Sequence, residues 1–171
     1  METQPKHDSR LLQKARQQGL ATPSDLEQLA IERGCDYYDL SNRVRETNAA
    51  ELAPARALEF SNEELAMALL LREHRSMLRT RMGAALFGSP GNDAHRLAQL
   101  AVEEDCADLA HYIASCGRQV ETTNDFWTKL AALLPSADYS RETMPHLSRF
   151  VEMTGIDRGK VGTQMRWIRP S

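Results

Sequence analysis

Two long apolar stripes, separated by the short segment 88–92, constrain the fold of this chain most. The first stripe runs through residues 61–87 and the second through residues 93–116. In both, apolar residues recur about every 3.6 positions, which is the period of one face of a helix. The members are Ala66, Met67, Leu70, Leu71, Met77, Leu78, Ala84 and Ala85, then Ala94, Leu97, Ala98, Ala101, Val102, Cys106, Leu109, Tyr112, Ile113 and Cys116. Because so short a linker favours antiparallel neighbours, we predict one long helical hairpin.

Capping residues mark the ends of these two helices. The Ser61 hydroxyl and the Glu64 carboxylate have the spacing of a capping box, in which each accepts from the backbone N–H of the other residue. Asp93 is a good N-cap for the second helix. Gly88 and Gly117 follow the two stripes, where glycine commonly ends a helix.

The rest of the chain also favours helix. Similar stripes and caps predict short helices within 9–18, 22–34, 124–134 and 143–154, and the aromatic residue Trp127 is expected in the core. β-Branched residues never form an alternating run, so we predict no strand. The expected fold is an all-α, single-core bundle of six or seven helices, built on the long antiparallel helical hairpin.

The chain divides into three segments by composition and pattern. Residues 1–58 are expected to hold short helices as a small hairpin, with a hinge as one interpretation of the stretch before residue 59. Residues 59–155 form the main helical bundle. Residues 156–171 form a basic tail that contains glycines.

One polar residue interrupts each long stripe, and Arg81 lies less centrally in the first. His74 and Asp105 are almost equally far from the linker, so an antiparallel hairpin places them level and in contact. A buried Asp–His pair that fixes the register is the structural interpretation, because each group would be costly to bury alone. The functional interpretation is an imidazole that acts as a base or metal ligand, with the carboxylate behind it.

A second group of polar residues lies along the second long helix. Glu104, Asp108 and His111 have the spacing at which carboxylates and an imidazole can share a metal ion. A di-iron bundle needs Glu-x-x-His from two helices, whereas this chain offers one Asp-x-x-His. We therefore favour a solvated acidic face, and we expect no metal and no other cofactor.

The C-terminal tail carries the candidate residues for partner binding. They are Arg158, Lys160, Arg166, Trp167 and Arg169. One interpretation is an arm that docks on an acidic partner or on nucleic-acid phosphates, with the tryptophan as its anchor. The other is a tail folded back across the acidic residues 59–116, which buries the tryptophan.

Charge and cysteine content restrict the classes of function. A formal net charge of −3 argues against a general polyanion binder. The first two short helices depart from the helix-turn-helix pattern, because Leu26 and Leu29 fall one position late. The three cysteines have no paired spacing and the polar N-terminus gives no secretory signal, which predicts reduced thiols in the cytoplasm. No apolar window is long enough to cross a membrane.

The leading hypothesis is a non-enzymatic cytoplasmic interaction or regulatory protein with a protein partner. It is favoured because no complete catalytic constellation is present in the sequence. The alternatives are a nucleic-acid-associated accessory factor that uses the basic tail, and an enzyme or metal protein centred on His74 and Asp105.

Overall fold

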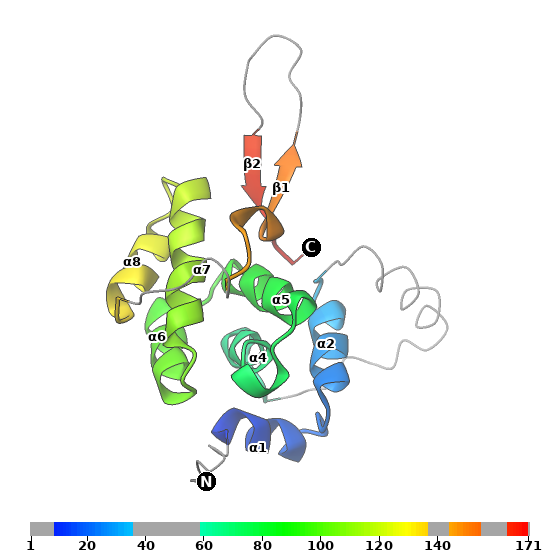
Figure 1. Ribbon diagram of the computed structural model, residues 1–171. Coiled ribbons are helices and arrows are strands. Elements are labelled where there is room, and N and C mark those ends of the chain that lie inside the picture. The colour runs from blue at the N-terminus through cyan, green and yellow to red at the C-terminus, as the bar shows by residue number, and fades with distance from the viewer. Residues whose placement is uncertain (1–8, 36–58, 137–143, 155–163, 171) are drawn as a thin grey trace, which may run out of the picture.

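The protein has an all-α fold with one small two-stranded sheet (Figure 1). The computed structural model describes residues 9–35, 59–136, 144–154 and 164–170. Its α-helices are α1 (Arg10–Gln17), α2 (Pro23–Glu32), α4 (Asn62–Leu69), α5 (Met77–Phe87), α6 (Ala94–Glu103), α7 (Ala107–Val120) and α8 (Asp125–Leu133). The 3-10 turn η1 (Arg72–His74) precedes α5. A second 3-10 turn, η2 (Leu147–Arg149), precedes the strands β1 (Val151–Thr154) and β2 (Gln164–Trp167).

The predicted helix starts before residue 135 are confirmed. The Ser61 hydroxyl accepts from Glu64 N at 3.1 Å, and the Glu64 carboxylate accepts from Ser61 N at 2.9 Å. Asp93 caps α6 through His95 N. Ser9, Thr22 and Asn124 cap α1, α2 and α8 in the same way. Local side-chain acceptors therefore set where most of the described α-helices begin.

The long helical hairpin is wrong in detail, because each of its two helices is broken. The first ends at Leu69, passes through η1 and starts again after Ser76, whose hydroxyl accepts from Arg79 N at 3.2 Å. The second breaks after Glu103, where Asp105 adopts a left-handed backbone conformation with φ of 55°. Both breaks lie inside stripes that keep the same periodicity, so the pattern alone did not reveal them.

Breaking the first helix allows α5 to fold back against α4. Gly83 lies at their contact, where an added Cβ would be 2.8 Å from Leu70 Cδ2 and 3.0 Å from Ala66 O. Glycine therefore permits an approach between the two helices that any larger residue would disturb.

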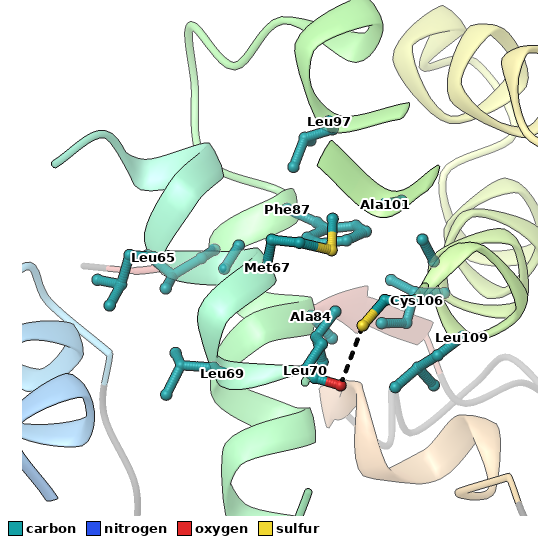
Figure 2. Close-up of a cluster of buried hydrophobic side chains, with 14 of the residues drawn as sticks. Leu65, Met67, Leu69, Leu70, Ala84, Phe87, Leu97, Ala101, Cys106 and Leu109 are labelled. Carbon is teal, nitrogen blue, oxygen red and sulfur yellow. Dashed lines mark hydrogen bonds between the residues drawn. The ribbon is translucent and has the colours of Figure 1, made fainter. Parts of the chain in front are cut away.

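Helix α4 occupies the centre of the core. All residues from Leu65 to Leu71 are buried, and α4 packs against α1, α2, α5 and α6. Figure 2 shows side chains from α4, α5, α6 and α7 meeting there, with the Cys106 thiol 3.5 Å from Leu70 O. Buried apolar residues from α1 through β2 belong to this one core.

The predicted helix within 143–154 and the prediction of no strand are also wrong. Residues Leu147–Arg149 form a 3-10 turn, and the chain then enters β1, which pairs antiparallel with β2. The register places Val151 opposite Trp167 and Glu152 opposite Arg166. The pairing partner lies too far along the chain for a local pattern to reveal it.

Helices α7 and α8 pack around a second glycine contact. Trp127 on α8 is fully buried, as the sequence predicts, and its indole lies against the backbone at Gly117 on α7. A Cβ at residue 117 would overlap the indole ring. The absence of a side chain at this position therefore makes room for the largest residue of the core.

The Gly117→Ala variant tests this contact. Alanine favours helix by about 1 kcal/mol, yet we expect a net loss of about 1–3 kcal/mol in the free energy of unfolding, because the indole must move. Urea denaturation measures the change. Gln119→Ala on the exposed face of the same helix is the control and should stay within about 0.5 kcal/mol of the parent chain. A Gly117→Ala chain as stable as the parent would contradict the close contact.

Candidate interaction site

His74 and Asp105 do not form the predicted buried pair. Asp105 is exposed at the turn between α6 and α7, and no hydrogen bond or ion pair joins it to His74 among the described residues. Arg72 faces this turn instead, with Nε 3.3 Å from Asp105 O and 3.7 Å from its carboxylate. The two helix breaks thus lie side by side, as the equal distances of His74 and Asp105 from the linker suggested. The turn at Asp105, however, exposes its carboxylate.

Arg81 is half-buried on α5. Its Nε donates to the backbone oxygen of Arg149 at 3.1 Å, which ties α5 to the turn before β1. This contact gives the residue a structural role at that place in the fold.

The break between α6 and α7 separates Glu104 from the other two weak metal candidates, Asp108 and His111. Glu104 turns towards α1 and accepts from Leu11 N at 3.1 Å, whereas Asp108 lies 3.6 Å from Arg72 Nη2. His111 lies a turn further along α7. The described residues contain no group of three or more potential ligands that could hold a metal ion.

The three cysteines are buried and free. Burial raises the pKa of the Cys106 and Cys116 thiols to about 11. Because the thiolate is the reactive form, both thiols are protonated and unreactive near neutral pH. They fill the core, as the sequence analysis predicts.

The described part of the C-terminal segment is folded back on the helices. Trp167 is buried, with its ring centroid 4.6 Å from that of Trp127 and 5.8 Å from that of Phe150. Its indole N–H donates to Ala84 O at 3.3 Å. The tryptophan is therefore part of the core, and the interpretation as an exposed partner anchor is wrong.

The arginines of this segment also have partners within the chain. Arg166 forms an exposed ion pair with Glu152 across the sheet at 2.7 Å. Arg169 donates to Gly88 O at 3.1 Å and forms an ion pair with Glu121. Arg158 and Lys160, the other two predicted binding residues, lie outside the described residues.

Glu121 links the tail to α7 and α8. Its carboxylate accepts from Trp127 Nε1 at 2.6 Å and from Asn124 Nδ2 at 3.1 Å, besides pairing with Arg169. Burial raises the pKa of this carboxyl, but the hydrogen bonds from these groups more than offset it, so the pKa is lowered.

A different site, an open groove, lies where α1, α4 and α6 meet. Its volume is about 650 Å³. The residues that line it are Lys14, Glu59, Phe60, Ser61, Glu63, Glu64, Asp93 and Arg96. The starts of α4 and α6 both open into this groove, because Asp93 N donates to Glu63 Oε1 at 3.0 Å. We call it the α1–α4–α6 groove.

Glu64 is the buried centre of the groove. Its Oε1 accepts from Lys14 Nζ at 2.7 Å and lies 3.4 Å from Arg96 Nη2, while Oε2 takes the Ser61 backbone N–H. Burial raises the pKa of this carboxyl, but the hydrogen bonds from Lys14 and Ser61 and the charge of Arg96 lower it overall. The carboxylate is therefore held charged, although only 7% of its side chain is exposed.

The other carboxylates of the groove are less engaged. Glu59 is exposed, Glu63 accepts the Asp93 N–H, and Asp93 caps α6. None of the three forms an ion pair with another described residue. Both cations of the groove are directed to one oxygen of Glu64. Of the residues that line the groove, four are carboxylates and two are cations, so the described lining carries a net negative charge.

Sequence reasoning found only part of this site. The capping box identified Glu64 and the helix start at Asp93, but it gave no sign that the carboxylate is buried. Lys14 lies 50 residues before Glu64 and Arg96 lies 32 after it, so no local spacing relates the three.

Comparisons with known proteins add no assignment. The chain matches no model of a protein family, and neither the curated proteins nor the solved structures contain a significant match. Among the helices that the structure describes, none is long and apolar enough to cross a membrane.

Replacing Trp167 tests whether the C-terminal segment is part of the core. Trp167→Ala should lower the free energy of unfolding by about 3–5 kcal/mol, because a buried aromatic side chain and its contacts are lost. Chemical denaturation measures the loss. The neighbouring Arg166→Ala, which removes only an exposed ion pair, should change stability by less than about 1 kcal/mol. Equal effects of the two substitutions would show that the tryptophan is not packed on the helices.

Proposed function

We propose that this protein is a non-enzymatic interaction protein that binds a cationic segment of a partner protein in the α1–α4–α6 groove. The observation that carries the proposal is the net negative charge of the groove lining. Glu59, Glu63 and Asp93 surround a concave surface, and the cations of the groove are already bound to Glu64. A lysine or arginine side chain is the complement of such a rim.

The size and chemistry of the groove favour a peptide segment as the ligand. A volume of about 650 Å³ accommodates a few side chains. Phe60 is buried beneath the groove, so the accessible lining is mainly polar and charged. A segment with one or two basic side chains would match this surface.

The chemistry of the lining residues supports binding over catalysis. The Ser61 hydroxyl serves as a helix cap, and the Lys14 amine is held in an ion pair. The residues that line the groove include no histidine that could serve as a general base near neutral pH.

Two further observations bear on the setting of this function. The ion pairs of Arg166 and Arg169 reduce the positive charge that the described tail offers to nucleic acid, which disfavours the accessory-factor alternative. The buried free thiols support the cytoplasm as the compartment.

A titration with charged peptides tests the proposal. A short peptide that alternates arginine and glycine should shift the backbone amide signals of Glu63 and Asp93 in an NMR spectrum of the isotope-labelled protein. A peptide that alternates glutamate and glycine should not. Binding should weaken several-fold as the ionic strength rises from about 0.01 M to about 0.15 M, because salt screens an exposed electrostatic contact.

The double variant Glu59→Gln, Glu63→Gln gives the site-specific test. Each glutamine keeps the size of the side chain and an oxygen acceptor, so the fold should be retained. Loss of these two charges should weaken binding of the arginine peptide by about 3–10-fold. Glu73→Gln, at an exposed carboxylate on η1, is the matched control and should leave binding unchanged. Equal binding by the double variant and the parent chain would refute the proposed groove.

A further inference from the structure

Helix α1 docks on the rest of the protein through one face. The residues that make this contact are Leu11, Lys14, Ala15 and Gln18, which follow the i, i+3, i+4, i+7 spacing of a helix stripe. Leu11 and Ala15 are buried, whereas Arg10, Gln13, Arg16 and Gln17 are exposed. Figure 1 shows α1 at the edge of the helical body, on the side opposite the two-stranded sheet.

Polar contacts to the groove region accompany this small apolar face. Lys14 Nζ binds Glu64 at 2.7 Å, and Leu11 N donates to Glu104 Oε1 at 3.1 Å. At the other end of α1, Gln18 Oε1 accepts from Glu59 N at 3.3 Å. The helix is thus tied at its start, middle and end to acceptors and donors that belong to the body of the protein.

Two buried carboxylates form the polar part of the surface under α1. Glu64 and Glu104 are the buried charged residues in the described ranges, and each takes a donor from α1. A buried carboxylate needs such donors. The surface under α1 therefore requires a helix that brings a cation to Glu64 and a backbone N–H of its first turn to Glu104.

Helix α1 does not satisfy this surface completely. Glu104 Oε2 is buried and has no hydrogen-bond partner among the described residues, although its other oxygen accepts from Leu11 N. At the start of α1, the Leu12 N–H is already taken by the Ser9 hydroxyl. A helix whose first turn offered N–H groups to both oxygens of Glu104 would fit the same surface better.

We infer that α1 is a displaceable occupant of a helix-binding surface, and that an amphipathic, cationic helix of a partner protein takes its place. The partner helix would carry leucine, lysine and alanine at the spacing of Leu11, Lys14 and Ala15. This inference rests on the proposed function for the cationic character of the partner. It adds that α1 restrains binding, since its own lysine occupies Glu64 until the partner arrives.

The connection between α1 and α2 permits the displacement of α1. Gly19 follows α1 with φ of 84°, a backbone conformation that suits glycine, and Leu20 after it is buried. Helix α2 can remain packed on α4 and α5 while α1 moves away.

Hydrogen exchange on the full chain tests whether α1 opens on its own. We expect the α1 amides to exchange about 100-fold faster than those of α5, because α1 opens without global unfolding. Lys14→Ala should speed exchange in α1 by a further several-fold and leave α5 unchanged. Arg16→Ala removes the same kind of charge from the exposed face of α1 and is the matched control. Equal exchange in α1 and α5, or equal effects of the two variants, would overturn the inference.

A peptide supplied in trans tests the surface itself. A fluorescent peptide with the sequence of residues 9–21 should bind the full-length Lys14→Ala chain at least about tenfold more tightly than the parent chain, because the weakened α1 competes less. The same peptide with alanine in place of its lysine should bind neither. Dimerisation of the Lys14→Ala chain without peptide binding would replace the partner helix with a second copy and overturn the inference.

The two proposals fail separately. Binding of the α1 peptide without binding of the arginine–glycine peptide would refute the proposed function of the groove rim. It would leave the displacement of α1 by a partner helix in place. Binding of the arginine–glycine peptide without binding of the α1 peptide, together with slow hydrogen exchange in α1, would refute the displacement of α1. It would leave the proposed function of the groove in place.

Discussion

The burial of α4 beyond its first two residues determines the arrangement of the described helices. Every residue from Glu64 to Leu71 is buried, so this part of the chain has no face for solvent and needs neighbours on all sides. Helices α1, α2, α5 and α6 supply them, and Gly83 lets α5 approach most closely. The turn after Leu71 follows from the same requirement, because a continuous helix would carry the α5 residues away from α4.

The same constraint creates the candidate site. Glu64 stands at the buried start of α4, where it closes the capping box with Ser61 and receives Lys14 and Arg96. Its lowered pKa means that this carboxylate contributes stability above the pKa of the unfolded chain, and that the contribution is lost as the pH falls through the folded value. The group that joins α1 and α6 to the central helix is therefore also the centre of the groove.

Sequence patterns predicted the helical class and the helix starts, since caps and stripes depend on residues a few positions apart. They did not predict the break before Ser76, because a capping serine inside an apolar stripe resembles any other polar residue of the exposed face. The left-handed turn at Asp105 and the pairing of Val151 with Trp167 were missed for a related reason. Each depends on contacts between segments that no local pattern connects, and so does the site, where Lys14 and Arg96 reach Glu64 from other helices.

Glu64 is a buried, charged carboxylate held by Lys14 and Arg96, and the titration of its carboxyl carbon by NMR tests this arrangement most directly. The expected pKa lies below the ordinary value of 4.5 in the parent chain and rises when Lys14 is replaced by alanine. A pKa above 4.5 in the parent chain, or one that the Lys14→Ala substitution leaves unchanged, would contradict the ion cluster on which the account of the fold and the groove depends.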